Sequence, residues 1–447
     1  MSTLTAPNRT TAGSRLRDLP TLLAAARPAR VGVVTSILGL GLEVSGLACP
    51  VGAVVHIGAA RIPAEVVAAT RTTLHCMPLG ALESISAGDE VHTTGRPALI
   101  PVGHGLMGRV IDGLGRPIDG KGPLAGHELV ALENEPPSPM ERTRISEQLQ
   151  LGVRALDTMT AVGRGQRIGL FAGSGVGKSS LLSMVARGTN AEVNVIALVG
   201  ERGREVREFL EEDLGPEGLA RSIVVVSTSD EPARMRLRAA FAATRIAEHF
   251  RDGGSDVLLM MDSLTRVAMA QREIGLSAGE PPATRGYPPS TFSLLARLLE
   301  RAGTDATGSI TGIYTVLVDG DDHNEPIADS ARSLLDGHVV LDRKLAVAGH
   351  FPSIDILGSV SRVASRVTSR DDAATAASLR RILAARRAAQ DLLDVGAYQR
   401  GTNPLVDAAV DHEEDINSFL CQRLDAPVPA TAAWSELTAL VRGMGVA

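Results

Sequence analysis

A glycine-rich run that ends in lysine and serine offers the clearest chemistry in this chain. The run is Gly173-Ser174-Gly175-Val176-Gly177-Lys178-Ser179-Ser180, and Lys178 is one of only three lysines among 45 lysines and arginines. Glycines let backbone N–H groups point inward around an anion, and a compact ammonium fits between two phosphates where a planar guanidinium fits poorly. The run therefore predicts a nucleotide-binding loop, in which Lys178 bridges the β- and γ-phosphates and the Ser179 hydroxyl binds Mg²⁺.

The residues on either side of this run give it the setting that a phosphate-binding loop needs. The apolar stretch 167–172 predicts a strand and 178–187 predicts a helix, so the loop leads into a helix N-terminus, whose dipole favours an anion. Ala172 stands where the motif usually has its first glycine, but the remaining spacing is intact. The alternative is a glycine-rich turn with an incidental lysine, which the strand–loop–helix setting disfavours.

Two carboxylates follow other predicted strands. Asp262 ends the apolar stretch 256–261, and a carboxylate at this end of a strand can hold Mg²⁺ through water. Glu201 is the first carboxylate after the apolar stretch 193–199, where it could orient a water in line with the γ-phosphate. A solvated charged turn is the alternative, and Glu205 fits that role better than Glu201.

Hydrolysis also needs a positive group to offset the charge that develops on the γ-phosphate. Arg362 follows a short polar stretch and is a candidate arginine finger, a group that often comes from a neighbouring subunit. An arginine in such a stretch is more commonly a surface residue, so spacing alone leaves both interpretations open.

The order of predicted elements indicates three domains after an N-terminal segment. Residues 29–97 contain short β-like runs punctuated by glycine, which predicts a β-barrel. Strands and helices alternate through residues 98–368, which predicts an α/β domain with a mostly parallel sheet, and residues 369–447 predict a helical domain. Residues 1–28 are expected to be flexible or helical, with leucines that either bind a partner or belong to a solvated tail.

Composition narrows the classes of function. The net charge is −6 and only 11 residues are aromatic, which argues against nucleic acid as a partner. The three cysteines form no close pair, as expected in a reducing compartment, and no apolar run is long enough for a signal peptide or a membrane span. We therefore expect a cytoplasmic protein that reaches a membrane only through partners.

Longer motifs resemble a known family. The phosphate loop, the run 200–205 and Asp262-Ser-Leu-Thr-Arg266 are similar to the catalytic subunits of rotary ATP synthases. The runs 270–290, 298–303 and 319–326 resemble more specifically the ATPases of type III protein export, in flagella and injectisomes, and the run 35–46 resembles the flagellar branch. The resemblance covers about residues 30–400.

The resemblance implies a β-barrel, a RecA-like ATPase domain that binds ATP and Mg²⁺, and a helical C-terminal domain, assembled as a homohexamer. It implies that Glu201 is the catalytic glutamate, that Arg362 is the finger inserted into the next subunit's site, and that Phe351 packs on adenine. Tyr398 is a weaker candidate for contact with the base. The loop 275–290 would line the pore of the ring.

The expected function is therefore ATP hydrolysis within a type III export apparatus, in first place the flagellar one. Expected partners are a regulator or stalk protein at the N-terminus, export chaperones and their substrates, and, through partners, the export gate at the inner face of the membrane. A rotary ATP synthase subunit is the second hypothesis, disfavoured by the run 270–290. The negative net charge disfavours a ring RNA translocase. The joint presence of Lys178 and Glu201 disfavours a ring that does not hydrolyse ATP.

Overall fold

The computed structural model describes residues 30–318 and 325–445, which fall into two compact units. One unit ends at Arg96 and the other begins at Pro97, and each is described by itself. The partner-binding segment predicted for residues 1–28 lies outside the described residues.

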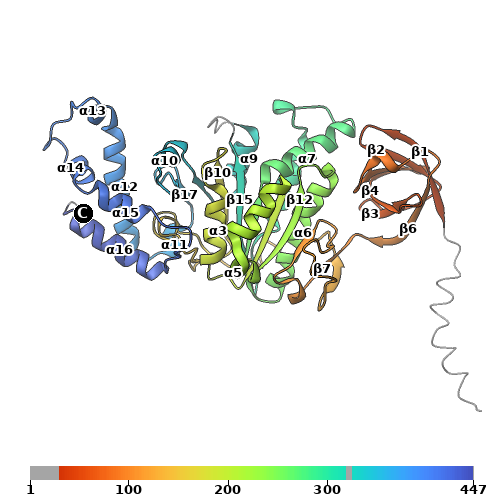
Figure 1. Cartoon of the computed structure of the whole chain (residues 1–447), viewed down its shortest axis with the longest axis horizontal. Helices are drawn as coiled ribbons and strands as arrows, with labels where there is room; N and C mark the ends of the chain where they lie inside the picture. The colour runs from red at the N-terminus through yellow and green to blue at the C-terminus, as the bar shows by residue number, and fades with distance from the viewer. Residues whose placement is uncertain (1–29, 319–324, 446–447) are drawn as a thin grey trace, which may run out of the picture. The chain divides into compact units, whose positions relative to one another are not determined.

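The first unit is a closed barrel of six strands, as the glycine-punctuated pattern predicted (Figure 1). The strands are β1 (Val31–Leu38), β2 (Gly41–Ser45), β3 (Ala53–Ile57), β4 (Ile62–Ala69), β5 (Thr73–Pro78) and β6 (Glu90–Pro97), in the order β1-β2-β5-β4-β3-β6. Alternate side chains point inward, as a half-buried strand requires, and Val34, Val44 and Val55 are among those that fill the interior. Cys49 and Cys76 are buried in the same core, and both are free thiols.

The second unit is built on a nine-stranded sheet that confirms the predicted α/β class (Figure 1). Its main path is β17-β16-β10-β15-β13-β11-β12-β8, with β14 paired to β15. These strands are β8 (Val110–Asp112), β10 (Arg167–Ala172), β11 (Val193–Glu201), β12 (Ser222–Thr228), β13 (Asp256–Asp262), β14 (Gly303–Thr304), β15 (Ser309–Leu317), β16 (Gly337–Val340) and β17 (Val360–Ser361). All pairings from β8 to β16 along the path are parallel, so their carboxyl ends share one edge.

Helices cover both faces of this sheet, because successive strand residues point to opposite sides. Ile196 and Leu198 of β11 pack in one core with Leu182 of α3 (Lys178–Gly188), whereas α6 (Ala233–Asp252) contacts β11, β12 and β13. The other elements of this region are α4 (Gly203–Glu208), α5 (Gly215–Ala220), α7 (Leu264–Ser277), α8 (Pro289–Glu300), α9 (Pro326–Leu334), α10 (Arg343–Val347), α11 (Ala364–Val367) and the small β7–β9 sheet (Leu99–Val102 and Glu128–Ala131). Strands buried on both sides explain the nearly continuous apolar runs in the sequence.

The C-terminal part is helical, as predicted. It contains α12 (Arg370–Ala388), α13 (Gln390–Asp394), α14 (Pro404–Asp411), α15 (Glu413–Leu420) and α16 (Ala430–Gly443), and α12 packs against both α14 and α16. α14 begins at Pro404, and the Asn403 side chain caps it by accepting a hydrogen bond from Leu405 N. Ala389 separates α12 from the short α13 that follows it.

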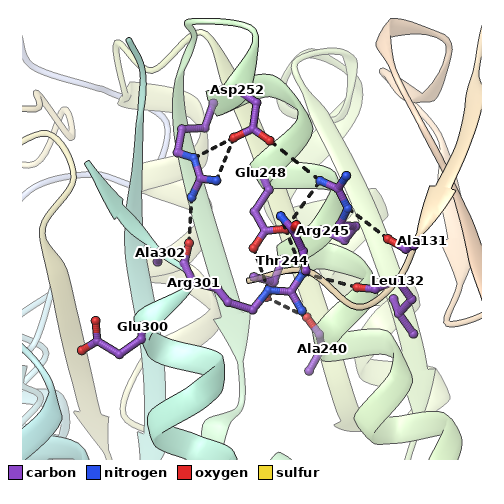
Figure 2. Close-up of polar contacts among 12 residues, drawn as sticks. Ala131, Leu132, Ala240, Thr244, Arg245, Glu248, Asp252, Glu300, Arg301 and Ala302 are labelled. Carbon is purple, nitrogen blue, oxygen red and sulfur yellow. Dashed lines mark hydrogen bonds and ion pairs between the residues drawn. The ribbon is translucent and has the colours of Figure 1, made fainter. Parts of the chain in front are cut away.

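A buried ion pair connects the strand β9 region to the helices (Figure 2). Arg301, after α8, binds both carboxylate oxygens of Glu248 on α6 at 2.6 and 2.8 Å, and these side chains are 1% and 0% exposed. Asn134 donates to the same Glu248, and Arg301 also approaches the Leu132 carbonyl. The segment after β9 is thereby fixed to α6 through charged side chains rather than through apolar packing alone.

Candidate active site

A cavity of about 480 Å³ lies at the shared carboxyl edge of the central strands. Its walls come from the ends of β10, β11, β13 and β15 and from the start of α3. The predicted site residues on its lining are Gly173, Ser174, Gly175, Gly177, Lys178, Ser179, Ser180, Glu201 and Asp262. Val176 is buried beneath the loop rather than on the cavity surface. The structure therefore brings most of the predicted residues together from three separate strand ends.

The glycine-rich loop has the backbone shape that its residues predicted. Gly175 and Gly177 have φ values of +74° and +90°, which side-chain-bearing residues adopt only with strain. Gly177 is also the N-cap of α3 and provides no side-chain cap, so the first N–H groups of this helix remain available for an anion. The Ser353 hydroxyl donates to the Val176 carbonyl at 2.6 Å and fixes the loop from beneath.

Lys178 forms the centre of a charged cluster. Its Nζ lies 2.6 Å from Asp262 Oδ1 and 3.3 Å from Glu201 Oε1. Burial by itself lowers the pKa of Lys178, but the charges of Asp262 and then Glu201 outweigh burial and raise the pKa above its usual value. The side chain therefore stays a charged ammonium that can bind phosphate.

The carboxyl group of Glu201 has a pKa far from its usual value. Burial, followed by the negative charge of Asp262, raises the pKa of Glu201 to about 7. A carboxyl group with a pKa near neutrality can both accept and release a proton at physiological pH, which an ordinary glutamate does poorly. The cavity thus combines the positive charge of Lys178 with a carboxyl group whose pKa is close to neutrality.

The oxygen donors of the cavity suit a hard cation. The Ser179 hydroxyl and the Asp262 carboxylate line the same cavity, and oxygen ligands of this kind are those that Mg²⁺ prefers. Among the residues that the structure describes, no group of three or more His, Cys, Asp or Glu side chains forms a metal site by itself.

Phe351 lies beside the loop with its ring partly open to solvent. A Cβ on Gly177 would be 3.5 Å from this ring, and 43% of Phe351 is exposed. An exposed phenylalanine against a phosphate-binding loop offers a flat apolar face to a nucleotide base.

The segment 421–428, between α15 and α16, passes behind these elements. Gln422 N donates to the Phe351 carbonyl at 2.9 Å, and Gln422 Nε2 donates to the Gly152 carbonyl at 2.8 Å. Near the other end of α3, Arg187 donates to the Leu424 carbonyl. The segment therefore contacts Phe351 as well as the helix that carries Lys178.

Arg362 does not line the cavity of its own chain. It follows β17 at the far end of the strand order, is exposed, and donates to the Arg332 carbonyl at 3.2 Å. Tyr398 also lies outside the cavity lining, and its hydroxyl is hydrogen-bonded to Asp407 and to the Asn403 carbonyl.

Several cavity residues were not predicted as site residues from the sequence, namely Arg202, Asp213 and Arg266. Glu205, which was interpreted as part of a solvated charged turn, also lines the cavity. Arg266 lies against Gly200, where an added Cβ would be 3.0 Å from Arg266 Cβ, and φ of Gly200 is +73°. Glycine at 200 is therefore needed for Arg266 to reach the cavity. The available signal was the run Asp262-Ser-Leu-Thr-Arg266, which places Arg266 in the first turn of α7, directly after the strand that ends in Asp262.

Comparison with known proteins supplies two family matches. The nucleotide-binding domain of the ATP synthase alpha/beta family matches residues 152–361. The T3SS EscN ATPase C-terminal domain matches residues 368–439.

Individual relatives cover nearly the whole chain. The flagellum-specific ATP synthase of Bacillus subtilis (strain 168) is 51% identical over 416 residues, which is 92% of this chain and 95% of that protein. The type 3 secretion system ATPase of Xanthomonas euvesicatoria is 48% identical over 413 residues, 92% of this chain and 93% of that protein.

Solved structures agree with these matches. The assembled ATPase EscN from the enteropathogenic E. coli type III secretion system superposes with a TM-score of 0.86 at 42% identity, covering 92% of this chain and all of that one. The same values hold for EscN in complex with its central stalk EscO. No helix within residues 30–318 and 325–445 has the length and apolar character to cross a membrane.

Proposed function

This chain belongs to the ATP synthase alpha/beta family and is an ATPase of type III protein export, and from this we propose a mechanism for its cavity and a role in export. The observation that carries the proposal is the meeting of Lys178, Glu201 and Asp262, from different strand ends, within one cavity.

The loop residues bind the triphosphate of ATP. Lys178 leaves its two carboxylate partners and bridges the β- and γ-phosphates, while the N–H groups at the start of α3 hold the phosphate oxygens. Ser179 and Asp262 would hold Mg²⁺, which would supply positive charge to the phosphate oxygens. Phe351 packs on the adenine ring.

Glu201 then orients the attacking water in line with the γ-phosphate and accepts its proton. The negative charge that develops on the γ-phosphate needs a further cation, which we assign to Arg362 of a second copy of this chain. The exposure of Arg362 and its distance from its own cavity along the strand order support this assignment. Hydrolysis then requires a ring of copies, for which we propose a homohexamer.

We place this ATPase at the cytoplasmic face of the membrane, attached through partners to the export gate. Its cycle releases export substrates from chaperones and delivers them to the gate, and a stalk or regulator protein binds at the N-terminal end. The complex of EscN with EscO supports a stalk partner, and the flagellum-specific relatives support the flagellar form.

The test combines turnover with export. Phosphate release from Mg·ATP is measured for the wild type, Glu201→Gln and the exposed Glu217→Gln, which lies on α5 away from the cluster. Glu201→Gln should bind ATP and lower kcat by at least about a hundredfold, whereas Glu217→Gln should match the wild type. In cells, Glu201→Gln should abolish secretion of hook and filament proteins. Normal hydrolysis by Glu201→Gln would reassign the base, and normal flagellar secretion without this chain would remove the flagellar assignment.

A further inference from the structure

A threonine on the neighbouring strand is hydrogen-bonded to the carboxylate that is assigned to Mg²⁺. Thr315, on β15, is fully buried, and its hydroxyl lies 2.7 Å from Asp262 Oδ1. The parallel register pairs Met261 of β13 with Tyr314 of β15, so the next residues along the two strands, Asp262 and Thr315, are adjacent. This is a direct contact between the strand that carries the carboxylate and the strand beside it.

Both side chains are on the sheet face that α3 covers. Met260, two residues before Asp262, and Ile313, two residues before Thr315, belong to the same apolar core as the inner face of α3. Since strand side chains alternate, Asp262 and Thr315 continue these two rows toward the cavity. An apolar side chain would pack equally well at this position, so packing alone does not explain the Thr315 hydroxyl.

The hydroxyl has one proton and two acceptors in reach. Asp262 Oδ1 is at 2.7 Å and the Met261 carbonyl is at 3.3 Å. A hydrogen bond to a carboxylate is shorter and about twice as strong as one to a neutral carbonyl, so the proton goes to Asp262. Without such an acceptor, the buried hydroxyl would cost about 1–3 kcal/mol.

Asp262 Oδ1 therefore accepts two hydrogen bonds, one from Thr315 and one from Lys178 at 2.6 Å. The second oxygen, Oδ2, receives no hydrogen bond from the described residues, and Asp262 lines the cavity. When Lys178 turns to the phosphates of ATP, as in the proposed function on which this inference rests, Thr315 becomes the remaining protein donor to this carboxylate.

We propose that Thr315 is a positioning residue, which holds Asp262 through Oδ1 so that Oδ2 stays available to the Mg²⁺ shell throughout the nucleotide cycle. A partner that orients a metal-binding carboxylate in this way typically changes metal affinity or activity by about 10- to 100-fold when it is removed. Thr315 acts on the metal through Asp262 and does not itself line the cavity.

The test measures Mg²⁺ dependence separately from turnover. A fluorescent ADP analogue is titrated onto the purified full-length chain at increasing Mg²⁺ and, in parallel, in EDTA. Thr315→Val, which keeps the shape and removes the hydroxyl, should raise the Mg²⁺ concentration for half-maximal binding by about tenfold and lower kcat by a similar factor. Binding in EDTA should be unchanged, and Thr315→Ser, which keeps the donor, should restore Mg²⁺ dependence to within about twofold of wild type.

Thr311→Val is the matched control. Thr311 is on the same strand and the same sheet face, is equally buried, and accepts a hydrogen bond from Gly165 N at 2.8 Å. It should lose stability without any change in Mg²⁺ dependence. A Thr315→Val protein that behaves like Thr311→Val in both respects would overturn the proposal. If Thr315→Val does not fold, Thr315→Cys, whose thiol is a weak donor, is measured with the same expected and contrary results.

Failure of the proposed function is separable from failure of this inference. A wild-type chain whose nucleotide binding ignores Mg²⁺ would contradict the proposed site. A wild-type chain that needs Mg²⁺, together with a Thr315→Val variant that needs no more of it, would contradict only the role of Thr315.

Discussion

Lys178 and Asp262 form a largely buried ion pair, with the ammonium 2.6 Å from Oδ1. The residue assigned to phosphate thus contacts the residue assigned to Mg²⁺, and Glu201 shares the same ammonium at 3.3 Å. Binding of phosphate to Lys178 has to exchange these contacts for new ones, so the same ion pair bears on both stability and function.

Lys178→Ala should therefore destabilise the nucleotide-free protein as well as abolish phosphate binding. Removing the cation leaves two part-buried carboxylates side by side, and breaking a buried pair in this way costs about 3–5 kcal/mol. Urea unfolding without nucleotide measures the loss. The double variant Lys178→Ala/Asp262→Asn should recover part of the stability, because it removes one of the two charges. Equal stability of Lys178→Ala and wild type would show that the ion pair contributes nothing to the free energy of unfolding.

The rate of hydrolysis should rise with pH through about 7. Glu201 must be ionised to accept the proton of water, and burial with the nearby Asp262 charge raises its pKa to about 7, so the protonated form dominates below that value. The profile of kcat/KM, which reports the free enzyme, is the measurement. Glu217→Gln should give the wild-type profile. A rate that stays constant from about pH 6 to 8 would be the contrary result.

Phe351→Ala should weaken binding of ATP without affecting a ligand that has no base. Stacking of a base on an aromatic ring contributes about 1–3 kcal/mol, so ATP affinity should fall by about ten- to a hundredfold. Inorganic tripolyphosphate, measured by calorimetry, is the control ligand and should bind both proteins equally. Phe351→Tyr should retain most of the affinity for ATP. Equal losses for ATP and tripolyphosphate would mean that Phe351 supports the Gly177 loop rather than the base.

Arg362→Ala and Lys178→Ala should complement each other in mixed assemblies. Each variant alone should be nearly inactive, because every site in a uniform ring lacks the same group. Random equal mixing gives about a quarter of the sites both an intact Lys178 and an intact Arg362 from the adjoining copy, so about a quarter of wild-type activity should return. Phosphate release after co-assembly is the assay. Mixtures that stay as inactive as the parents would remove Arg362 from the neighbouring site.

Arg301→Leu should be far more destabilising than a change in an exposed ion pair. It leaves the fully buried Glu248 carboxylate without its bidentate partner, at a cost of about 3–5 kcal/mol (Figure 2). Replacing both residues by leucine should be less harmful than Arg301→Leu alone, because the Glu248 charge is removed with its partner and Arg245 keeps its contact with Asp252. Arg207→Leu, which breaks the exposed Arg207–Glu211 pair, should cost about 1 kcal/mol or less. Similar losses at both sites would show that the buried pair is screened by water.

Features that depend on neighbouring residues in the chain could be predicted from the sequence. The loop around Lys178 needs glycine at positions with positive φ, and a strand before it and a helix after it, all of which leave local traces. The strands that end in Glu201 and Asp262 were equally visible, because burial on both faces makes them continuously apolar. The roles of these residues in catalysis stay predictions, as does the placement of Arg362 in a neighbouring site.

The order of the strands could not be predicted in the same way. β8 has three residues, too few for any periodic signal, yet it forms one end of the central sheet beside β12. The contact between Thr315 and Asp262 depends on the register of β13 against β15, which side-chain pattern does not encode when both faces are buried. For the same reason, the Arg301–Glu248 pair, 53 positions apart, left no trace in the sequence.

The segment 421–428 has a practical consequence for protein engineering. Because the main chain of Gln422 is bonded to Phe351 and that of Leu424 to Arg187, this stretch forms part of the back wall of the nucleotide domain although it follows most of the C-terminal helices in the chain. A chimera that exchanges everything after residue 368 between relatives would replace the segment 421–428 together with the C-terminal helices. The nucleotide affinity of such chimeras should change even when every residue of the phosphate-binding loop is identical. An exchange that keeps residues 421–428 native should leave the nucleotide affinity unchanged.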